Sequence, residues 1–245
     1  YDPSTGRFAP TRNSLSVGRH AFGISILRDG RVLITGGSVV GNSLNGNGVT
    51  AVDLFDPDTS EFRPMAHMHD GRSLHAQVSL RDGRVVVIGG AQTSCEIYDP
   101  ETNQWTVLSG RLPTCLKDMK AFELFDGRIF IAGGQDTADG VTTDATWYLN
   151  PQTGELTSGP SMAGFNYSNT GPHTGVSDYS AFDLFPTESR LRGRYLLFAG
   201  GEHDPLTGPD VEYNSAALFD VTRARFIDVG PMPFIHDDHT ESMLS

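Results

Sequence analysis

One short phrase occurs five times along this chain of 245 residues, and this internal repeat constrains the fold more than any other feature. The copies read YDPSTGRF, FDPDTSEF, YDPETNQW, LNPQTGEL and FDVTRARF, and they begin at Tyr1, Phe55, Tyr98, Leu149 and Phe219. A second phrase alternates with the first: DGRVLITGG, DGRVVVIGG, DGRIFIAGG and RGRYLLFAGG each join a turn to an apolar run that ends in two glycines. The two phrases stay in phase, which indicates a unit of roughly 50 residues that is copied with loop insertions.

Each apolar run predicts a β-strand with both faces buried, because its Val, Ile, Leu and Phe residues follow one another without helical spacing. The Asp-Gly-Arg before the run supplies the positive φ of a tight hairpin, so the run should pair with the strand that precedes it. The glycine pair after the run allows a sharp exit and a close approach to a neighbouring backbone. These structural glycines are Gly36, Gly37, Gly89, Gly90, Gly133, Gly134, Gly200 and Gly201.

The Asp-Pro-x-Thr phrase predicts a second hairpin in each unit. Its Asp side chain can accept hydrogen bonds from backbone amides two residues on, and Pro presets φ. Flanking aromatic residues such as Tyr98 and Trp105 should then face each other across the hairpin. Two hairpins make a four-stranded antiparallel sheet, and stacking such sheets around an axis buries both of their apolar faces. We therefore expect an all-β protein, a β-propeller built from four-stranded antiparallel blades.

The double glycine with a downstream Tyr and a Trp or other aromatic partner resembles the repeat of the kelch family. The resemblance covers essentially all 245 residues and implies a kelch-type β-propeller. Copper-radical oxidases of the galactose oxidase type also contain kelch blades with similar phrases. Because kelch propellers serve many functions, the resemblance implies a fold without implying one activity.

The repeats predict a single propeller domain over residues 1–245. Complete blades are expected at 19–63, 74–107, 118–157 and 177–227, with the second half of a blade at 1–18 and the first strand of another at 238–245. Kelch propellers usually have six or seven blades, so we favour a fragment of such a ring, completed by blades from the same gene product or from another chain. A closed five-bladed ring is the alternative.

Composition argues against two classes of partner. The net charge is −12 and the 18 Lys and Arg residues are scattered, whereas a nucleic-acid binder should show a basic stripe. No apolar run approaches the roughly 20 residues that cross a bilayer, so no membrane insertion is expected. Cys95 and Cys115 should lie near the same rim, either as a disulfide or as two free thiols. The style of the phrases resembles secreted or surface kelch-like proteins of microbes, which implies an extracellular or cell-surface location.

The connections that follow the glycine pairs and those between blades should emerge at one rim, opposite the short Asp-Gly-Arg turns. These connections differ greatly in length, and all eight histidines fall in them or near the start of an inner strand. Side chains from different blades converge there on the axis, where cations, carboxylates and a tyrosine suit a polar peptide, a glycan or a substrate. A hydrated channel mouth is the alternative. The candidate ligand-binding residues are Arg19, His20, Arg72, His75, Lys117, Asp178, Tyr179, Asp238 and His239.

Two segments carry residues that bind metals in other proteins. The run from His236 to His239 combines imidazole and carboxylate, but neighbouring residues of an extended segment point to opposite sides, so its four side chains cannot converge. The candidate metal ligands are His236, Asp238 and His203. The segment QDTADGVTTD has the acidic and glycine content of a calcium loop without the spacing of the helix-loop-helix motif, which favours a polar surface loop. Its carboxylates are Asp136, Asp139 and Asp144.

The galactose oxidase resemblance implies a copper site with a Tyr-His pair at the start of an inner strand, a second His, and a tyrosine crosslinked to a cysteine. The corresponding segments read GRHAF, RSLHAQ, KDMKAF and SDYSAF, and the chain contains no Tyr-His dipeptide. The copper ligand set is therefore not carried over. We expect a binding module without catalytic residues or a cofactor, which recognises a protein segment or a glycan through the variable rim. The alternatives are an enzyme domain of the galactose oxidase-like kelch type, with a metal or polar active site there, and a structural component of a larger assembly.

Overall fold

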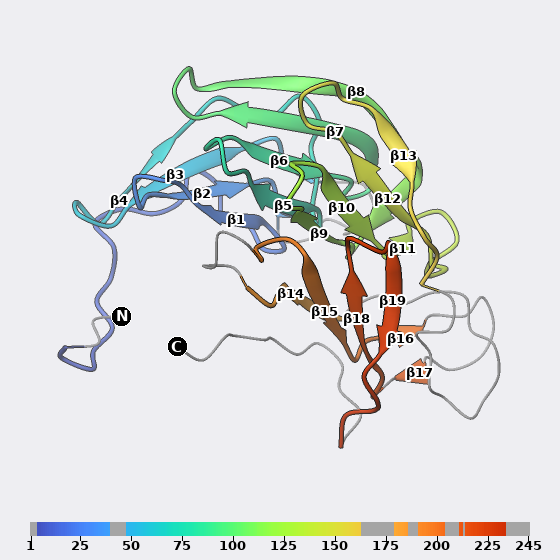
Figure 1. Ribbon diagram of the computed structural model, residues 1–245. Coiled ribbons are helices and arrows are strands. Elements are labelled where there is room, and N and C mark those ends of the chain that lie inside the picture. Colours follow the sequence, from blue (N-terminus) through green and yellow to red (C-terminus); the bar gives the residue numbers. More distant parts are fainter. Residues whose placement is uncertain are drawn as a thin grey trace.

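The computed structural model describes residues 4–39, 48–162, 179–185, 191–203, 211–212 and 214–233. All regular elements in these residues are β-strands, and most of them form four antiparallel sheets that follow one another along an arc (Figure 1). The innermost strands of successive sheets lie side by side: β1 (Gly23–Ile26) contacts β5 (Ala76–Ser79), β5 contacts β9 (Lys120–Glu123), and β9 contacts β14 (Ser180–Asp183). The predicted all-β fold of four-stranded antiparallel blades is confirmed.

Each blade proceeds from its innermost strand outward. Blade 1 adds β2 (Val32–Thr35), β3 (Val52–Asp56) and β4 (Glu61–Pro64) to β1. Blade 2 adds β6 (Val85–Ile88), β7 (Gln92–Asp99) and β8 (Gln104–Lys117) to β5. Blade 3 adds β10 (Ile129–Ala132), β12 (Thr146–Leu149) and β13 (Leu156–Ser158) to β9. Blade 4 adds β15 (Tyr195–Ala199), β18 (Ala216–Asp220) and β19 (Arg225–Asp228) to β14, and β16 (Glu202–His203) pairs with β17 (Val211–Glu212) in a separate ribbon.

Strand β8 is longer than the sequence predicted. It continues for 14 residues to Lys117, past the expected end of blade 2 at residue 107. Its pairing with β7 shifts register twice between Gln92 and Glu96, and its last residues pair with β11 (Gln135–Asp136), which comes from the connection within blade 3. A strand therefore replaces the expected loop between blades 2 and 3, and β8 leads almost directly into β9 at the axis.

The segments expected to form partial blades differ in how far they are described. Residues 4–18 form turns and extended backbone and contain no strand. The side-chain amide of Asn13 exchanges two hydrogen bonds with the backbone of Phe62, so this segment lies along β4. Residues 238–245 lie outside the described residues. The partial blades at both ends stay a prediction.

The glycine pairs lie where adjacent blades approach most closely. Gly37 and Gly90 have φ angles of 102° and 78°, and their amides donate to Arg72 O and Leu116 O, each at 2.8 Å, in the segment that enters the next blade. A Cβ on Gly90 would lie 2.7 Å from Ser73 O. Glycine is needed here both for the left-handed conformation and for the lack of a side chain.

A further left-handed residue precedes each described inner strand of the first three blades. Ala21, Leu74 and Asp118 have φ angles of 53°, 53° and 57°. The Leu74 amide donates to Ala21 O at 3.0 Å, and the Asp118 amide donates to Leu74 O at 2.9 Å. These bonds form a chain from blade to blade around the axis, and the sequence did not predict it because none of the three residues is glycine.

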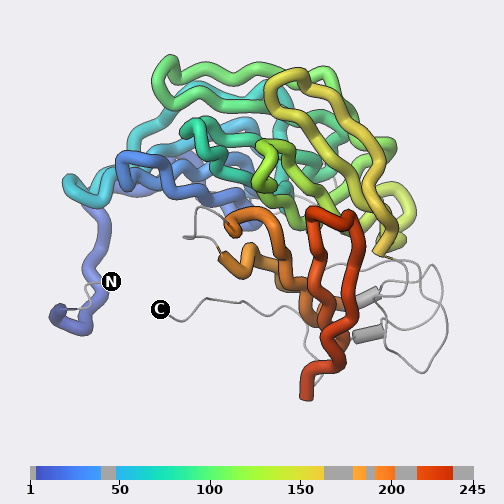
Figure 2. The backbone as a smooth tube through the Cα atoms, viewed as in Figure 1, coloured from blue at the N-terminus to red at the C-terminus, as the bar shows by residue number. Residues whose placement is uncertain are grey.

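The hydrophobic core of the described residues consists of three clusters, one at each interface between successive blades. Figure 2 shows how the backbones of these blades follow one another. Leu33 and Leu54 of blade 1 pack with Val87 and Trp105 of blade 2 in the first cluster. The stacked rings of Phe130 and Phe219, with centroids 4.3 Å apart, join blades 3 and 4. Buried faces on both sides explain why the apolar runs showed no alternation. In the described part of the chain, no helix is long and apolar enough to span a membrane.

Candidate ligand-binding rim

The chain turns at two rims. The loop-rich rim carries the connections that follow the second strands and those between blades. Its described residues include 36–39, 48–51, 65–75, 89–91, 118–119, 133–145, 159–162 and 200–203. The hairpin rim carries the Asp-Gly-Arg turns and the Asp-Pro turns, which close successive hairpins within each blade. The candidate ligand-binding residues were all expected at the loop-rich rim.

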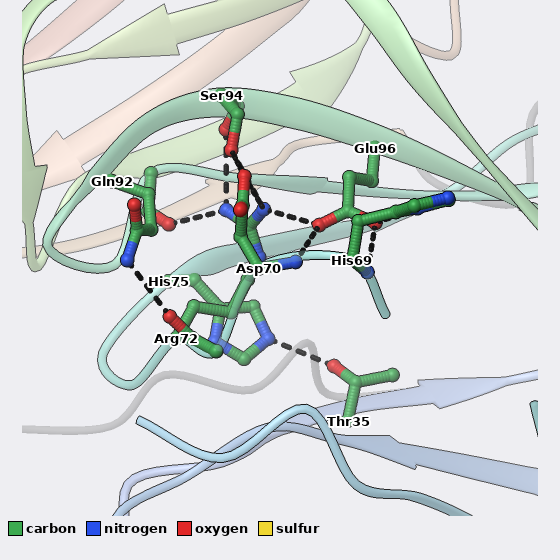
Figure 3. A network of polar contacts seen from close by, with 10 residues as sticks. Thr35, His69, Asp70, Arg72, His75, Gln92, Ser94 and Glu96 are labelled. Carbon is green, nitrogen blue, oxygen red and sulfur yellow. Dashed lines mark hydrogen bonds and ion pairs between the residues drawn. The ribbon is translucent and has the colours of Figure 1, made fainter. Parts of the chain in front are cut away.

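Arg72, one of these candidates, is completely buried beneath the loop-rich rim (Figure 3). Its guanidinium donates to Gly89 O at 2.6 Å and to the Ser94 hydroxyl at 3.0 Å, and it forms an ion pair with Glu96 at 2.7 Å. The other Glu96 oxygen accepts from the His69 amide at 2.8 Å and lies 2.9 Å from His69 Nδ1. Arg72 is thus held inside blade 2 and is not presented to a ligand.

The Glu96 carboxylate is fully buried and ionised. Burial alone would raise its pKa, but the amides of His69 and Asp70 together with Arg72 hold the pKa of Glu96 below its usual value. The network therefore ties the segment of residues 69–72 to strand β7. The network supports the loop-rich rim from below, and Glu96 compensates the charge of Arg72.

Arg19 occupies the equivalent place in blade 1. Each of the two arginines lies two residues before a left-handed residue, Ala21 or Leu74. Arg19 forms an ion pair with Asp53 at 2.8 Å, and both side chains are fully buried. Asp53 pairs with Ile34 across the sheet just as Glu96 pairs with Val87. The placement of Arg19 and Arg72 therefore does not support the expected ligand contacts, because each arginine neutralises a buried carboxylate.

His75, a third candidate, is also buried. Its Nε2 lies 2.8 Å from the Thr35 hydroxyl, which donates to Gln77 Oε1 at 2.5 Å. Burial first, and then the positive charge of Arg72, lower the pKa of His75 to about 3. The ring is therefore neutral at physiological pH, and it joins blade 2 to blade 1.

Tyr179 joins blades 4 and 3 in a similar way. Its side chain is 1% exposed, and its hydroxyl donates to Ala132 O at 2.5 Å. Burial raises the pKa of this phenol far above its usual value. Tyr179 therefore remains protonated, and its hydroxyl is occupied by a backbone carbonyl.

The remaining candidates are more open or lie elsewhere. His20 is exposed, and its backbone pairs with Ser38. Lys117, at the end of β8, is half-buried and forms no ion pair with the described residues. His203 lies in β16. Asp178, His236, Asp238 and His239 lie outside the described residues.

The described residues do not fit a copper centre. Among them, no three His, Cys, Asp or Glu side chains are placed to hold a metal ion. At the inner-strand starts, the Tyr179 hydroxyl is bonded to a carbonyl and the His75 ring lies beside the cation Arg72. Cys95 and Cys115 are free thiols, and burial raises the pKa of Cys95 to about 11.

The loop-rich rim does contain an open pocket, which the sequence did not single out. It has a volume of about 370 Å³ and lies between the end of β8 and the connection from β10 to β12. Asp136, Asp139 and Asp144 line it, together with Thr142 and the buried residue Trp147. The only sequence signal for this pocket was the acidic segment QDTADGVTTD. We call it the acidic rim pocket.

The hairpin rim contains a larger pocket of about 410 Å³, between the turns of blades 1 and 2. Its charges are mostly satisfied within the turns, since Asp29 pairs with Arg31 and Asp82 with Arg84, each at 2.6 Å. The acidic rim pocket has no such internal neutralisation, so we regard it as the better binding site.

Comparisons with known proteins agree with this architecture. A galactose oxidase from Gibberella zeae is 25% identical over 246 aligned residues, which cover 94% of this chain and 32% of that protein. Kelch-like protein 15 from Danio rerio is 31% identical over 88 residues, 33% of this chain and 14% of its own length. A solved structure of YjhT superposes with a TM-score of 0.67 at 14% identity, covering 91% of this chain and 73% of that one.

The chain has the fold of a kelch-type β-propeller and is similar in sequence to proteins with kelch blades. No protein-family model matches it. The chain spans about a third of the length of the galactose oxidase that it matches. The likeness to YjhT concerns the fold alone, because the two sequences differ at most positions.

Proposed function

We propose that this kelch propeller is a non-catalytic binding module that recognises its partner at the loop-rich rim. One observation carries the proposal: the acidic rim pocket is an open cavity, lined by three aspartates and by apolar side chains, on the rim that bears the variable connections. A rigid ring that displays divergent loops is suited to recognition, because the blades hold the loops in place. The candidate partners are a protein segment and a glycan.

An enzyme domain with a metal or polar active site on the same rim is the second candidate, and the 25% identity to a galactose oxidase favours it. The enzyme is disfavoured because the side chains of His75 and Tyr179 already form hydrogen bonds between blades. Metal analysis of the purified protein separates the two. A stoichiometric transition metal would favour the enzyme.

The test of the binding module is a screen of the protein against arrays of peptides and oligosaccharides. Thr114→Arg places a long side chain into the acidic rim pocket from an exposed position, and Thr102→Arg does the same in a pocket of the hairpin rim. The two variants change the charge equally. We expect Thr114→Arg to abolish the array hits and Thr102→Arg to retain them. The opposite result would place recognition on the hairpin rim, and an absence of any hit would contradict the proposal.

A further inference from the structure

The walls of the acidic rim pocket are well defined. Residues 135 and 136 form β11, which pairs with the end of β8. Across the loop, the Asp136 amide donates to Val141 O and the Thr143 amide donates to Gly134 O, both at 2.9 Å. The connection from β10 to β12 is thus a folded hairpin-like loop attached to blade 2, and main-chain hydrogen bonds hold this wall of the pocket.

The three carboxylates of the pocket are not neutralised. No Lys, Arg or His belongs to its lining, and Asp136, Asp139 and Asp144 form no ion pair with the described residues. Asp136 Oδ1 accepts from the Ala138 amide at 2.8 Å, and Asp139 Oδ1 accepts from the Val141 amide at 3.0 Å, which leaves the second oxygen of each carboxylate unused. Asp144 accepts a hydrogen bond from the Ser161 hydroxyl. Three negative charges therefore surround one cavity, which favours a cationic ligand over a neutral one.

A bare metal ion does not match this arrangement. A divalent cation needs its oxygen ligands to converge within 2.0–2.6 Å of one point. The described residues contain no group of three acidic or histidine side chains that converges in this way. The charges are instead spread around a cavity of about 370 Å³, which suits a ligand with several separated donors.

Trp147 supplies an independent feature at the floor of the pocket. Its side chain is 7% exposed and lines the cavity, yet its indole N–H makes no hydrogen bond to any described residue. The other tryptophan is different, because Trp105 donates to Ala66 O at 2.9 Å. The indole nitrogen of Trp147 is not fully enclosed, so its N–H is accessible to an acceptor. An acceptor group on the ligand would provide a hydrogen-bond partner.

We propose that the acidic rim pocket binds the guanidinium or ammonium group of an arginine or lysine in a protein segment, so that the partner of this kelch propeller is a basic peptide. The inference rests on the proposed function and narrows it to one partner class. The cationic group donates to Asp136, Asp139 and Asp144, and a main-chain carbonyl of the segment accepts from the Trp147 N–H. A neutral glycan would satisfy the indole but would leave the three charges without a counter-charge.

The test uses two peptides of nearly equal size and shape, acetyl-Gly-Arg-Gly-amide and its uncharged citrulline analogue, in titration calorimetry with the whole chain. We expect the arginine peptide to bind and the citrulline peptide to bind at least about fivefold more weakly. Asp136→Asn and Asp139→Asn keep the oxygen that caps each turn and remove one charge, and each should weaken arginine binding by about three- to fivefold. Added salt should weaken binding as well.

Asp58→Asn is the matched control, because Asp58 is exposed in an outer turn of blade 1 and its loss changes the net charge equally. Its arginine binding should equal that of the unmodified protein. The inference fails if Asp58→Asn weakens binding as much as Asp139→Asn, if citrulline binds equally well, or if the arginine peptide shows no saturable binding. It also fails if a methyl hexoside binds and depends on Asp139, which would indicate a glycan. If array hits are lost in Thr114→Arg although they contain no basic residue, that result would support the binding module and contradict only the basic-peptide inference.

Discussion

At the scale of single residues, left-handed backbone positions recur at fixed places in the repeat. The sixth position of the Asp-Pro phrase has a positive φ in every described copy, although only two copies have glycine there. The residues are Gly6, Ser60, Asn103, Gly154 and Ala224, with φ angles of 66°, 57°, 55°, 76° and 48°. A side chain at such an angle costs about 1–2 kcal/mol, except where Asn tolerates it.

Replacing Ala224 with glycine should therefore stabilise the protein, by about 0.5–1 kcal/mol after the larger chain entropy of glycine is deducted. Urea unfolding measures the change. Asn103→Gly is the informative contrast, because Asn103 Oδ1 accepts from the Tyr98 hydroxyl at 2.9 Å and from the Ala66 amide at 3.0 Å. That variant should lose stability. A gain from both, or from neither, would mean that backbone strain does not govern this turn.

His75 predicts how stability depends on pH. Its pKa falls from 6.5 in the unfolded chain to about 3 in the folded protein, so between these values only the unfolded state binds the proton. Folding stability is fully present above pH 6.5 and should fall by up to about 1.4 kcal/mol per pH unit as the pH drops towards 3. His75→Gln removes this contribution. Unfolding free energies at several pH values should thus show a shallower acid slope for the variant, and parallel slopes would contradict the burial of a neutral ring.

At the scale of the blade, the same position is filled in two chemically different ways. Blades 1 and 2 hold the buried pairs Arg19 with Asp53 and Arg72 with Glu96, whereas blade 3 has Leu116 and Trp147 at the equivalent places. A blade therefore folds with either an ion pair or an apolar pair. Neither partner is tolerable alone, because an unpaired buried charge is costly.

A double-mutant cycle tests this coupling in blade 2. Arg72→Met leaves Glu96 buried without its counter-charge and should cost about 3–5 kcal/mol of unfolding free energy. Arg72→Met combined with Glu96→Gln should cost less than the sum of the two single changes, since the amide still accepts hydrogen bonds from the segment of residues 69–70. Strict additivity in chemical denaturation would show that the pair is not coupled.

The elements differ in how far the sequence reveals them. The Asp-Gly-Arg turns and glycine pairs were predicted because the backbone preferences of Asp, Gly and Pro do not depend on distant contacts. The left-handed residues Ala21 and Leu74 were missed because tertiary hydrogen bonds impose that conformation. Arg19 and Arg72 were read as ligand contacts because their partners lie on a different strand. A comparison between repeats would have detected the pairs, since an Arg before the inner strand and an acid on the third strand occur together in blades 1 and 2 and are both absent from blade 3.

At the scale of the whole molecule, Arg81 links three blades at the hairpin rim. Its amide donates to Glu123 at 3.0 Å, and its guanidinium donates to Leu124 O at 2.8 Å and to Arg192 O at 3.3 Å. Blade 2 is thereby connected to blades 3 and 4 through one side chain. The acidic rim pocket, on the other rim, was likewise inaccessible to sequence reasoning, because two blades form it jointly.

Arg81→Ala should lower the unfolding free energy by about 1–3 kcal/mol, because it removes the side-chain ion pair with Glu123 and leaves the carbonyls of Leu124 and Arg192 without their guanidinium donor, while the amide bond to Glu123 remains. Arg31 in the equivalent hairpin of blade 1 is the matched control. It pairs with Asp29 within its own turn at the surface, and Arg31→Ala should cost about 0–1 kcal/mol. Thermal unfolding of both variants measures the difference. Equal losses of unfolding free energy would contradict a role of Arg81 in joining the blades.

The long strand β8 has a consequence for the kinetics of recognition. Because it runs from the outer edge of blade 2 to the axis and there pairs with β11, the seam between blades 2 and 3 is closed by main-chain hydrogen bonds. The residues around this seam are already held in place, so they lose little conformational entropy when a ligand binds. Most of the entropy lost on association is then lost by the ligand. Association should then occur in one step, at a rate proportional to ligand concentration, with no slow loop closure behind it.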